Sequence, residues 1–219
     1  GDGLSGLIVD YYHGGVVVQA HSPGMHSDRH QISAALREVM GSTLTCVYYK
    51  SQQADSPSAY LYGECELPHV VVEHGRQFYV DWVEGQKTGF FLDQRENRKL
   101  LADYSSGARV LNTFCYTGGF SVFALAAGAT AVCSVDASEK AIALTEKNLI
   151  LNGFDPQRNP CLTMDTFDYF KQIPDRQEGM ADPFDIIILD PPAFAKHKDA
   201  RHQAMKGYQR LNAEAMRVA

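Results

Sequence analysis

Four short segments of this sequence combine glycines, acidic groups and aromatic rings in a way that suits a nucleotide-like ligand. The first is Asn112–Ser121, where two adjacent glycines would let the backbone approach a ligand closely. A helix would begin at these glycines and present its N-terminal N–H groups to the ligand. Asp136 and Asp165 each follow an apolar run. Their carboxylates could accept hydrogen bonds from two ribose hydroxyls and from an adenine amino group, respectively. The fourth segment is 190–194.

Segment 190–194 has the sequence Asp-Pro-Pro-Ala-Phe. Two prolines fix the backbone after a strand, so the Asp190 carboxylate and the Pro191 carbonyl would project rigidly. Phe194 could stack on a planar base. This turn favours recognition of a nucleobase edge, and a rigid stop between strand and loop is the alternative.

Each feature has a simpler structural interpretation when it is taken alone. Paired glycines can serve helix packing, and an Asp at a strand end often caps the next helix. The order and spacing of all four segments together favour cofactor binding. A dehydrogenase-type dinucleotide site is disfavoured because G-x-G-x-x-G is absent, and no glycine follows Gly119 until Gly128.

From residue 109 onward, apolar runs of strand length alternate with helical patterns, which predicts a parallel sheet with crossover helices. The expected strands are 109–114, 131–135, 161–164 and 184–189, and the expected helices are 120–127, 138–152, 167–173 and 201–218. Open sheets of this kind bind ligands beyond the carboxyl ends of their strands, and the four segments follow those ends. The sequence therefore predicts an α/β, Rossmann-like doubly wound sheet.

The first part of the chain has a different pattern, with short alternating runs separated by Gly, Pro and polar breaks. One helical pattern covers 27–40 and places Ile32, Leu36 and Val39 on one face. We therefore expect an α+β module with a β-hairpin over residues 1–82, and the Rossmann-like domain over residues 83–219.

Composition narrows the function classes. With 45% hydrophobic and 21% charged residues, the chain has enough apolar material for one core and a small appended module. No apolar run approaches about 18 residues, so no membrane helix is expected. A net charge of −6 gives no bulk attraction to a polyanion. Nucleic-acid contact would need a local patch such as 195–210, with five Lys or Arg residues and one acidic residue, although a solvated helix face is the alternative.

The cysteines and histidines do not form a recognisable metal motif. Five cysteines are scattered without a C-x-x-C pair, which argues against both a zinc site and a disulfide framework and favours a reducing cytosol. His26 and His30 have a chelating i, i+4 spacing but no third ligand arranged beside them. No metal is therefore expected.

Several segments together resemble the bacterial 23S rRNA large-subunit methyltransferase I family. The similarity is carried by residues 85–98, 110–121, 190–196 and 207–208, and residues 1–80 resemble the middle β-rich domain of that family. The resemblance implies a class I methyltransferase fold, S-adenosyl-L-methionine as cofactor, and formation of 5-methylcytosine in large-subunit ribosomal RNA in the cytoplasm. It implies no membrane partner.

The resemblance also implies residue roles. Asp136 would bind the ribose of the cofactor and Asp165 its adenine, while Asp190, which also borders the cofactor, and Phe194 would face the target base. The residues expected around the methionine part of the cofactor are Phe114, Tyr116, Thr117, Gly118 and Gly119. The residues expected in a loop that closes over the methyl-donor end are Lys87, Thr88, Phe91, Asp93 and Arg95.

The sequence departs from the family at both ends. Family members begin with a small RNA-binding domain and continue to a further strand and a turn whose cysteine attacks C6 of cytosine. Carbon 5 accepts a methyl group only after such an attack. Cys115 is expected to contact the ligand or to pack, so this chain should bind cofactor without completing the reaction. An uncovered sheet edge predicts low solubility or pairing, for example in a homodimer.

Two rival functions remain at this stage. Related rRNA guanine methyltransferases share a similar Gly-Phe-Leu-Asp segment and an Asp-Pro-Pro-x-Phe turn, and they transfer methyl to nitrogen without a cysteine nucleophile. A non-catalytic RNA-binding module with a degenerate cofactor fold is the rival from another class. Loss of cofactor binding would favour the latter.

Overall fold

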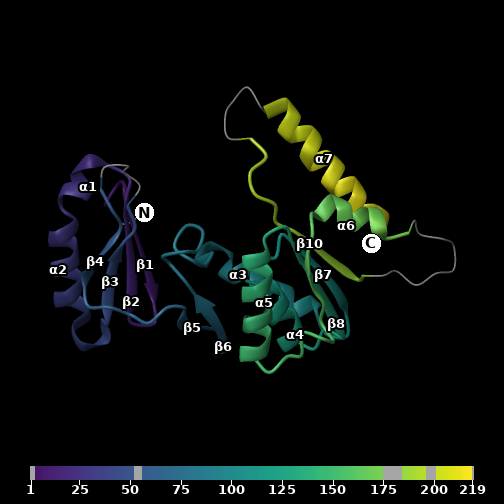
Figure 1. Ribbon diagram of the computed structural model, residues 1–219, viewed down its shortest axis with the longest axis horizontal. Helices are drawn as coiled ribbons and strands as arrows, with labels where there is room; N and C mark the ends of the chain where they lie inside the picture. The colour runs from purple at the N-terminus through teal and green to yellow at the C-terminus, as the bar shows by residue number, and fades with distance from the viewer. Residues whose placement is uncertain (1–2, 52–55, 175–183, 196–200, 219) are drawn as a thin grey trace. The chain divides into compact units, whose positions relative to one another are not determined.

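The computed structural model describes residues 3–51, 56–174, 184–195 and 201–218, and it divides into two compact units (Figure 1). Unit 1 comprises Gly1–Glu73 and Phe78–Asp93, and unit 2 comprises His74–Gln77 and Gln94–Ala219. Segment 83–93, which the sequence pattern placed with the second domain, therefore belongs to unit 1. One reason is that the Lys50 ammonium donates to the carbonyl oxygens of Trp82 and Gly85, both at 2.7 Å.

Unit 1 is built on a four-stranded sheet in the order β1-β2-β3-β4. Its strands are β1 (Leu7–Tyr12), β2 (Gly15–Ala20), β3 (Cys46–Tyr49) and β4 (Ala59–Tyr62). β2 and β3 are parallel, so the chain crosses over between them. The crossover and the hairpin that follows the sheet consist of α1 (Pro23–Ser27), α2 (Arg29–Met40), η1 (Gly41–Thr43), β5 (His69–Glu73) and β6 (Arg76–Val80).

Helix α2 covers one face of this sheet. Ile32, Leu36 and Met40 recur every four residues and pack against a core that includes Val16 and Val18. The sequence pattern placed Val39 on this face, but Val39 is 85% exposed. The apolar stripe therefore continues to Met40 because helical neighbours are four residues apart.

Cys46 and Cys65 are joined by a disulfide, so the expectation that this chain has no disulfide is wrong. β3 and β4 are antiparallel and align Val47 with Tyr62, so the chain leaving β4 returns beside the start of β3. Gly63 makes this approach possible, since it has φ +52° and a Cβ there would collide with the carbonyl oxygen of Thr45. Sequence spacing alone does not reveal this neighbourhood.

Among the described residues, unit 2 contains a parallel sheet with the strand order β10-β7-β8-β9. Its strands are β7 (Arg109–Thr113), β8 (Ala131–Asp136), β9 (Cys161–Thr163) and β10 (Ile186–Leu189). After η2 (Leu92–Gln94), the helices are α3 (Arg95–Tyr104), α4 (Gly119–Ala126), α5 (Glu139–Leu151), α6 (Thr166–Gln172) and α7 (Arg201–Val218). The predicted parallel sheet is confirmed, and its strand order reverses at β7, where open sheets bind ligands.

Helices cover both faces of this sheet (Figure 1). Consecutive strand residues point to opposite faces. Val110 packs in a cluster with Ala124 of α4, whereas its neighbour Leu111 packs with Phe170 of α6 and Leu211 of α7. Burial on both faces accounts for the continuous apolar runs of these strands. Within the described ranges, no helix is both long and apolar enough to cross a bilayer.

A buried hydrogen-bonded network links β7 and β8 to α4. The Asn112 amide donates to the Ser121 hydroxyl at 2.8 Å, and that hydroxyl shares a 2.7 Å hydrogen bond with the hydroxyl of Ser134. All three side chains are at most 1% exposed. Buried polar groups without hydrogen-bond partners cost free energy, so this network holds β7, α4 and β8 in one relative arrangement.

Candidate cofactor site

The turn that follows β7 has a strained backbone. Phe114 and Tyr116 have φ of 53° and 48°, and Gly118 has φ of 71°. Left-handed conformations cost a residue with a side chain about 1–2 kcal/mol, and they persist mainly where a functional site requires them. Gly118 is also the N-cap of α4. The backbone N–H groups of the first turn of α4 therefore lie at the carboxyl ends of the strands.

Two polar side chains of α5 support this turn from inside the protein. The Thr145 hydroxyl donates to the carbonyl oxygen of Tyr116 at 2.9 Å, and the Asn148 amide donates to that of Thr117 at 2.8 Å. Both side chains are fully buried. Gly118 approaches so closely that a Cβ on it would lie 2.5 Å from Thr145 Cγ2.

Sequence reasoning missed Thr145 and Asn148. The available signal was a pair of polar residues, three positions apart, on the face of α5 that also buries Ala141, Ile142 and Leu149. Polar side chains on such a face must find partners. Here the partners are the carbonyl groups of the turn, so the two residues act as positioning groups for it.

Asp136, at the end of β8, is fixed by two backbone groups. One carboxylate oxygen accepts from the N–H of Tyr116 at 3.0 Å, and the other accepts from the N–H of Ser138 at 2.9 Å. Each oxygen retains a further lone pair. The carboxylate is therefore held against the turn in one orientation and can accept hydrogen bonds from vicinal hydroxyls.

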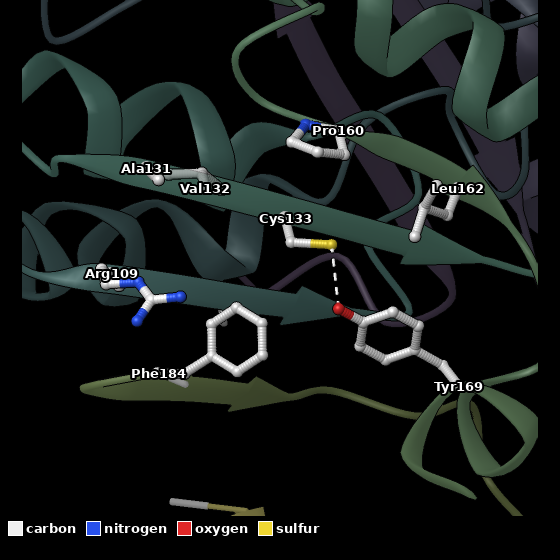
Figure 2. A pocket seen from close by; sticks show the side chains of 8 residues that line it. All are labelled: Arg109, Ala131, Val132, Cys133, Pro160, Leu162, Tyr169 and Phe184. Atoms are coloured by element: carbon white, nitrogen blue, oxygen red, sulfur yellow. Dashed lines mark hydrogen bonds between the residues drawn. The ribbon is translucent and has the colours of Figure 1, made fainter. Parts of the chain in front are cut away.

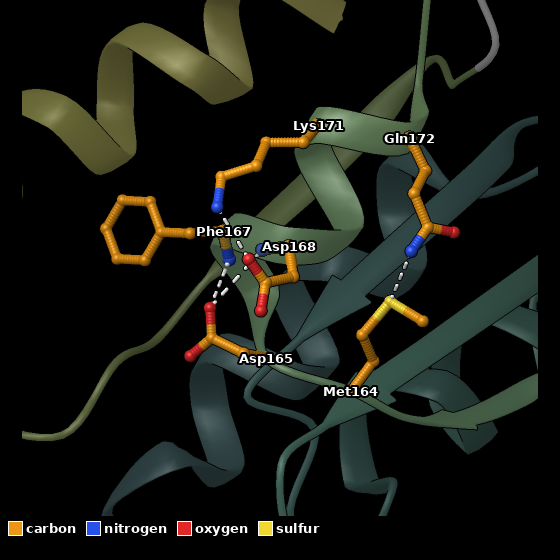
Figure 3. Close-up of polar contacts among 6 residues, drawn as sticks. All are labelled: Met164, Asp165, Phe167, Asp168, Lys171 and Gln172. Carbon is orange, nitrogen blue, oxygen red and sulfur yellow. Dashed lines mark hydrogen bonds and ion pairs between the residues drawn. The ribbon is translucent and has the colours of Figure 1, made fainter.

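Asp165 is the N-cap of α6 (Figure 3). Its Oδ1 accepts from the N–H groups of Phe167 at 2.8 Å and Asp168 at 3.3 Å. The capping role that the sequence left open is therefore present. These two bonds use one carboxylate oxygen, so contact with an adenine amino group would involve Oδ2.

Asp190 is exposed directly after β10. Its Oδ2 accepts from the side-chain amide of Gln94 at 3.2 Å, and the oxygen of that amide accepts from Asn97 at 2.7 Å. Asn97 thus sets the orientation of the Gln94 amide, so that its N–H faces Asp190. Phe194, at the other end of the turn, is half-buried beside Tyr208 of α7.

Cys115 lies inside the turn but is not an activated nucleophile. Its side chain is buried 3.6 Å from the Thr145 hydroxyl, and burial is the main cause that raises the pKa of its thiol well above the usual range. Burial likewise raises the pKa of Cys133 and raises that of Cys161 to about 11. Because the thiolate is the reactive form, none of these three cysteines is poised for attack.

Thr88 is buried within unit 1, where its hydroxyl has partners of its own. It donates to Oδ2 of Asp10 at 2.6 Å and shares a 2.8 Å hydrogen bond with the hydroxyl of Tyr12. These contacts anchor the segment 85–93 to β1. A role of Thr88 toward the cofactor stays a prediction.

The other residues of the predicted closing loop are divided between the units. In unit 1, the Lys87 ammonium lies 4.4 Å from the centre of the Phe91 ring, and Asp93 is exposed. In unit 2, exposed Arg95 pairs with Glu96 at 3.1 Å. Their proposed contacts with the methyl-donor end also stay predictions.

A cavity of about 290 Å³ lies elsewhere in unit 2 (Figure 2). Arg109 and Ala131, the first residues of β7 and β8, line it. So do Cys133 and Tyr169, whose thiol and hydroxyl are 3.3 Å apart. Its lining includes the first residues of β7 and β8 and excludes both Asp136 and the turn after β7, so this cavity is distinct from the candidate cofactor site.

The fold and the site together define a class of protein. A parallel sheet whose first strand leads into a glycine turn, and whose second strand ends in a positioned carboxylate, is shared by dinucleotide-binding Rossmann folds and class I S-adenosylmethionine-dependent methyltransferases. The turn lacks G-x-G-x-x-G, which favours the methyltransferase class. The residues of the site fit S-adenosylmethionine, since the strained turn offers N–H groups and Asp136 offers hydroxyl acceptors. Among the described residues, no three His, Cys, Asp or Glu side chains are grouped to hold a metal ion.

Comparison with known proteins agrees with this class. Residues 26–216 match the S-adenosylmethionine-dependent methyltransferase family, and the chain belongs to that family. It is 39% identical over 99% of its length to ribosomal RNA large subunit methyltransferase I of Aeromonas hydrophila. It is 37% identical, again over 99% of its length, to the protein of the same name from Tolumonas auensis. The chain spans 55% of the length of each relative.

A solved structure is also similar. The crystal structure of SMU.776 complexed with SAH has a TM-score of 0.78 and 33% sequence identity, and the match covers 95% of this chain and 54% of that protein. The predicted fold and cofactor class are confirmed. The cofactor of this family is S-adenosylmethionine.

Proposed function

We propose that this chain is the cofactor-binding part of a longer enzyme that methylates large-subunit ribosomal RNA, forming 5-methylcytosine. The names of the relatives at 37–39% identity support ribosomal RNA as the substrate. The observation that carries the cofactor assignment is the Asp136 carboxylate, which two backbone N–H groups hold against the turn. In this orientation the carboxylate could accept hydrogen bonds from two ribose hydroxyls.

We propose the following cofactor contacts, which the resemblance to the family suggests. Phe114, Tyr116, Thr117, Gly118 and Gly119 form the turn that would surround the methionine part. Asp165 would reach the adenine through its uncapped oxygen, and Asp190 would border the methyl group. Thr88, Phe91, Asp93 and Arg95 are proposed for the closing loop.

S-adenosylmethionine supplies an electrophilic methyl group. Carbon 5 of cytosine becomes nucleophilic enough to accept it when a thiolate adds to C6. The buried thiol of Cys115 does not fit this role. We propose that the attacking cysteine belongs to a part of the enzyme outside this chain, and that Asp190 and Phe194 position the base.

A guanine N-methyltransferase is the second candidate. It is favoured by the exposed carboxylate of Asp190, which could accept a hydrogen bond from an exocyclic amino group. That reaction would need no cysteine. We further propose a cytoplasmic location, since that is where ribosomal RNA of bacteria is modified, and we keep a homodimer as the assembly to be tested.

The cofactor assignment is tested by calorimetric titration of the full-length protein with S-adenosylhomocysteine and, separately, with NAD. We expect only the former to bind, and Asp136→Asn to weaken it about 10- to 100-fold because charge-assisted hydrogen bonds are lost. Asp168→Asn, which alters an exposed carboxylate paired with Lys171, is the matched control and should bind normally. Binding of NAD alone would contradict the assignment.

The product is identified by mass spectrometry of nucleosides from methylated ribosomal RNA. 5-Methylcytidine is expected. A methylated guanosine would favour the second candidate. Absence of both cofactor binding and methyl transfer would favour a non-catalytic RNA-binding module.

A further inference from the structure

The segment after Asp190 has few backbone N–H groups with which to form hydrogen bonds. Pro191 and Pro192 have no N–H group, so Ala193 and Phe194 carry the first backbone donors after Asp190. The N–H of Phe194 donates to the hydroxyl of Tyr208 on α7, at 3.4 Å. One side chain of α7 therefore accepts one of only two backbone hydrogen bonds that residues 191–194 can donate.

The same tyrosine also packs against the Phe194 ring. The ring centroids of Phe194 and Tyr208 are 4.5 Å apart, with 36° between the ring planes. Such aromatic pairs contribute beyond the area they bury. Tyr208 itself is 38% exposed, so its contact with Phe194 is not simply a consequence of deep burial in the core.

Gly207 makes room for this contact. A Cβ at this position would lie 2.9 Å from Cδ2 of Phe194 and 3.3 Å from Cε2. The glycine lies within the 18-residue helix α7, where glycine is unfavourable compared with alanine by about 1 kcal/mol. Helix formation therefore does not explain it, whereas the close approach of Phe194 does.

The opposite end of the turn has a second attachment. Asp190 accepts from Gln94, which Asn97 orients in turn. The turn is thus held by a side chain preceding α3 at its first residue and by α7 at its last residue. Because the intervening prolines are stiff, fixing the two ends fixes the whole turn.

We propose that Tyr208, seated against Phe194 by Gly207, is a positioning residue that sets the Asp190–Phe194 turn for the target base. This inference rests on the proposed function, since it assigns the turn to base positioning. Tyr208 acts through Phe194 and the turn, and it does not itself touch the reacting atoms. When Tyr208 is changed, Gln94 still holds Asp190, the end of the turn that is proposed to border the cofactor. Loss of Tyr208 should therefore affect use of the RNA and leave cofactor affinity unchanged.

The test uses the full-length protein and three variants. Tyr208→Phe removes the hydroxyl and keeps the ring, and we expect kcat/KM for the RNA to fall about 3- to 10-fold, the effect of one neutral hydrogen bond. Gly207→Ala should reduce kcat/KM at least as much, because the added methyl group displaces the Phe194 ring. Tyr104→Phe, at a tyrosine that is 69% exposed on α3, is the control and should match the wild type.

Two further readouts separate positioning from a merely structural role. Affinity for S-adenosylhomocysteine should stay within twofold of wild type in all variants. Hydrogen exchange at the Phe194 amide should accelerate in Tyr208→Phe. In addition, Gly207→Ala should change thermal stability little, because the gain of about 1 kcal/mol in helix propensity offsets the overpacking against Phe194, while its activity falls.

Unchanged RNA kinetics in both Tyr208→Phe and Gly207→Ala would overturn the inference and leave the proposed function standing. An equal loss of cofactor affinity and RNA use would also overturn it, by indicating general damage. If the wild-type enzyme binds cofactor but methylates no RNA, the proposed function fails, and the inference fails with it.

Discussion

The close contact between Gly118 and Thr145 makes Gly118→Ala the most informative single substitution in the cofactor turn. The new Cβ would lie 2.5 Å from Thr145 Cγ2, and 3.1 Å from both Cβ and Oγ1 of Thr145. It would also place a side chain at φ +71°. Thr145 cannot move away freely, because its hydroxyl holds the carbonyl group of Tyr116.

Two costs add in this variant. A left-handed alanine costs about 1–2 kcal/mol, and overpacking in a tightly packed region costs about 1–3 kcal/mol. Gly153→Ala is the matched control, because Gly153 has φ +80° and nothing lies within 4 Å of its Cβ position. The two variants should therefore differ in unfolding free energy by the cost of the contact with Thr145, which is about 1–3 kcal/mol.

The assay is denaturant unfolding followed by circular dichroism, together with titration by S-adenosylhomocysteine. We expect Gly118→Ala to be less stable than Gly153→Ala and to bind the ligand at least 10-fold more weakly. Adding Thr145→Ser removes the methyl group at 2.5 Å while keeping the hydroxyl, so the double variant should recover part of the stability. Equal stability of Gly118→Ala and Gly153→Ala, or no recovery in the double variant, would refute this reasoning.

Two predictions concern the cysteines. Burial raises the pKa of Cys115, so its reactive thiolate is scarce at neutral pH; iodoacetamide at pH 8 should leave Cys115 unmodified in the folded protein and modify it after denaturation, as peptide mass spectrometry can show. Rapid labelling of the folded protein would contradict the buried position. Reduction of the Cys46–Cys65 disulfide, which closes a loop with a sequence separation of 19, should lower the unfolding free energy of unit 1 by about 3 kcal/mol, measured by denaturation with and without reductant. Thiol titration before the experiment should find these two cysteines unreactive; a reductant that frees both thiols without any effect on stability would contradict the expected constraint.

The sequence by itself determined the order of elements in unit 2 and the ends of its strands. The expected helix 201–218 coincides with α7, and the expected strands at 109–114 and 131–135 differ from β7 and β8 by one residue. Helix and strand periodicities are local properties of a sequence, and a sheet buried on both faces gives continuous apolar runs. Asp136 and Gly118 were visible for the same reason, since ligand groups follow strand ends in this topology.

Only the tertiary structure decided which side chains support the site. Thr145 and Asn148 are 29 and 31 residues from the carbonyl groups that they hold, and Gln94 is 96 residues from Asp190. Polar residues of these types occur on any helix, and their partners depend on how α5 and α3 pack. The Cys46–Cys65 pair likewise depended on the register of β3 and β4. Periodicity places residues along one element, whereas packing between elements selects the partners, and that information is distributed over the whole core.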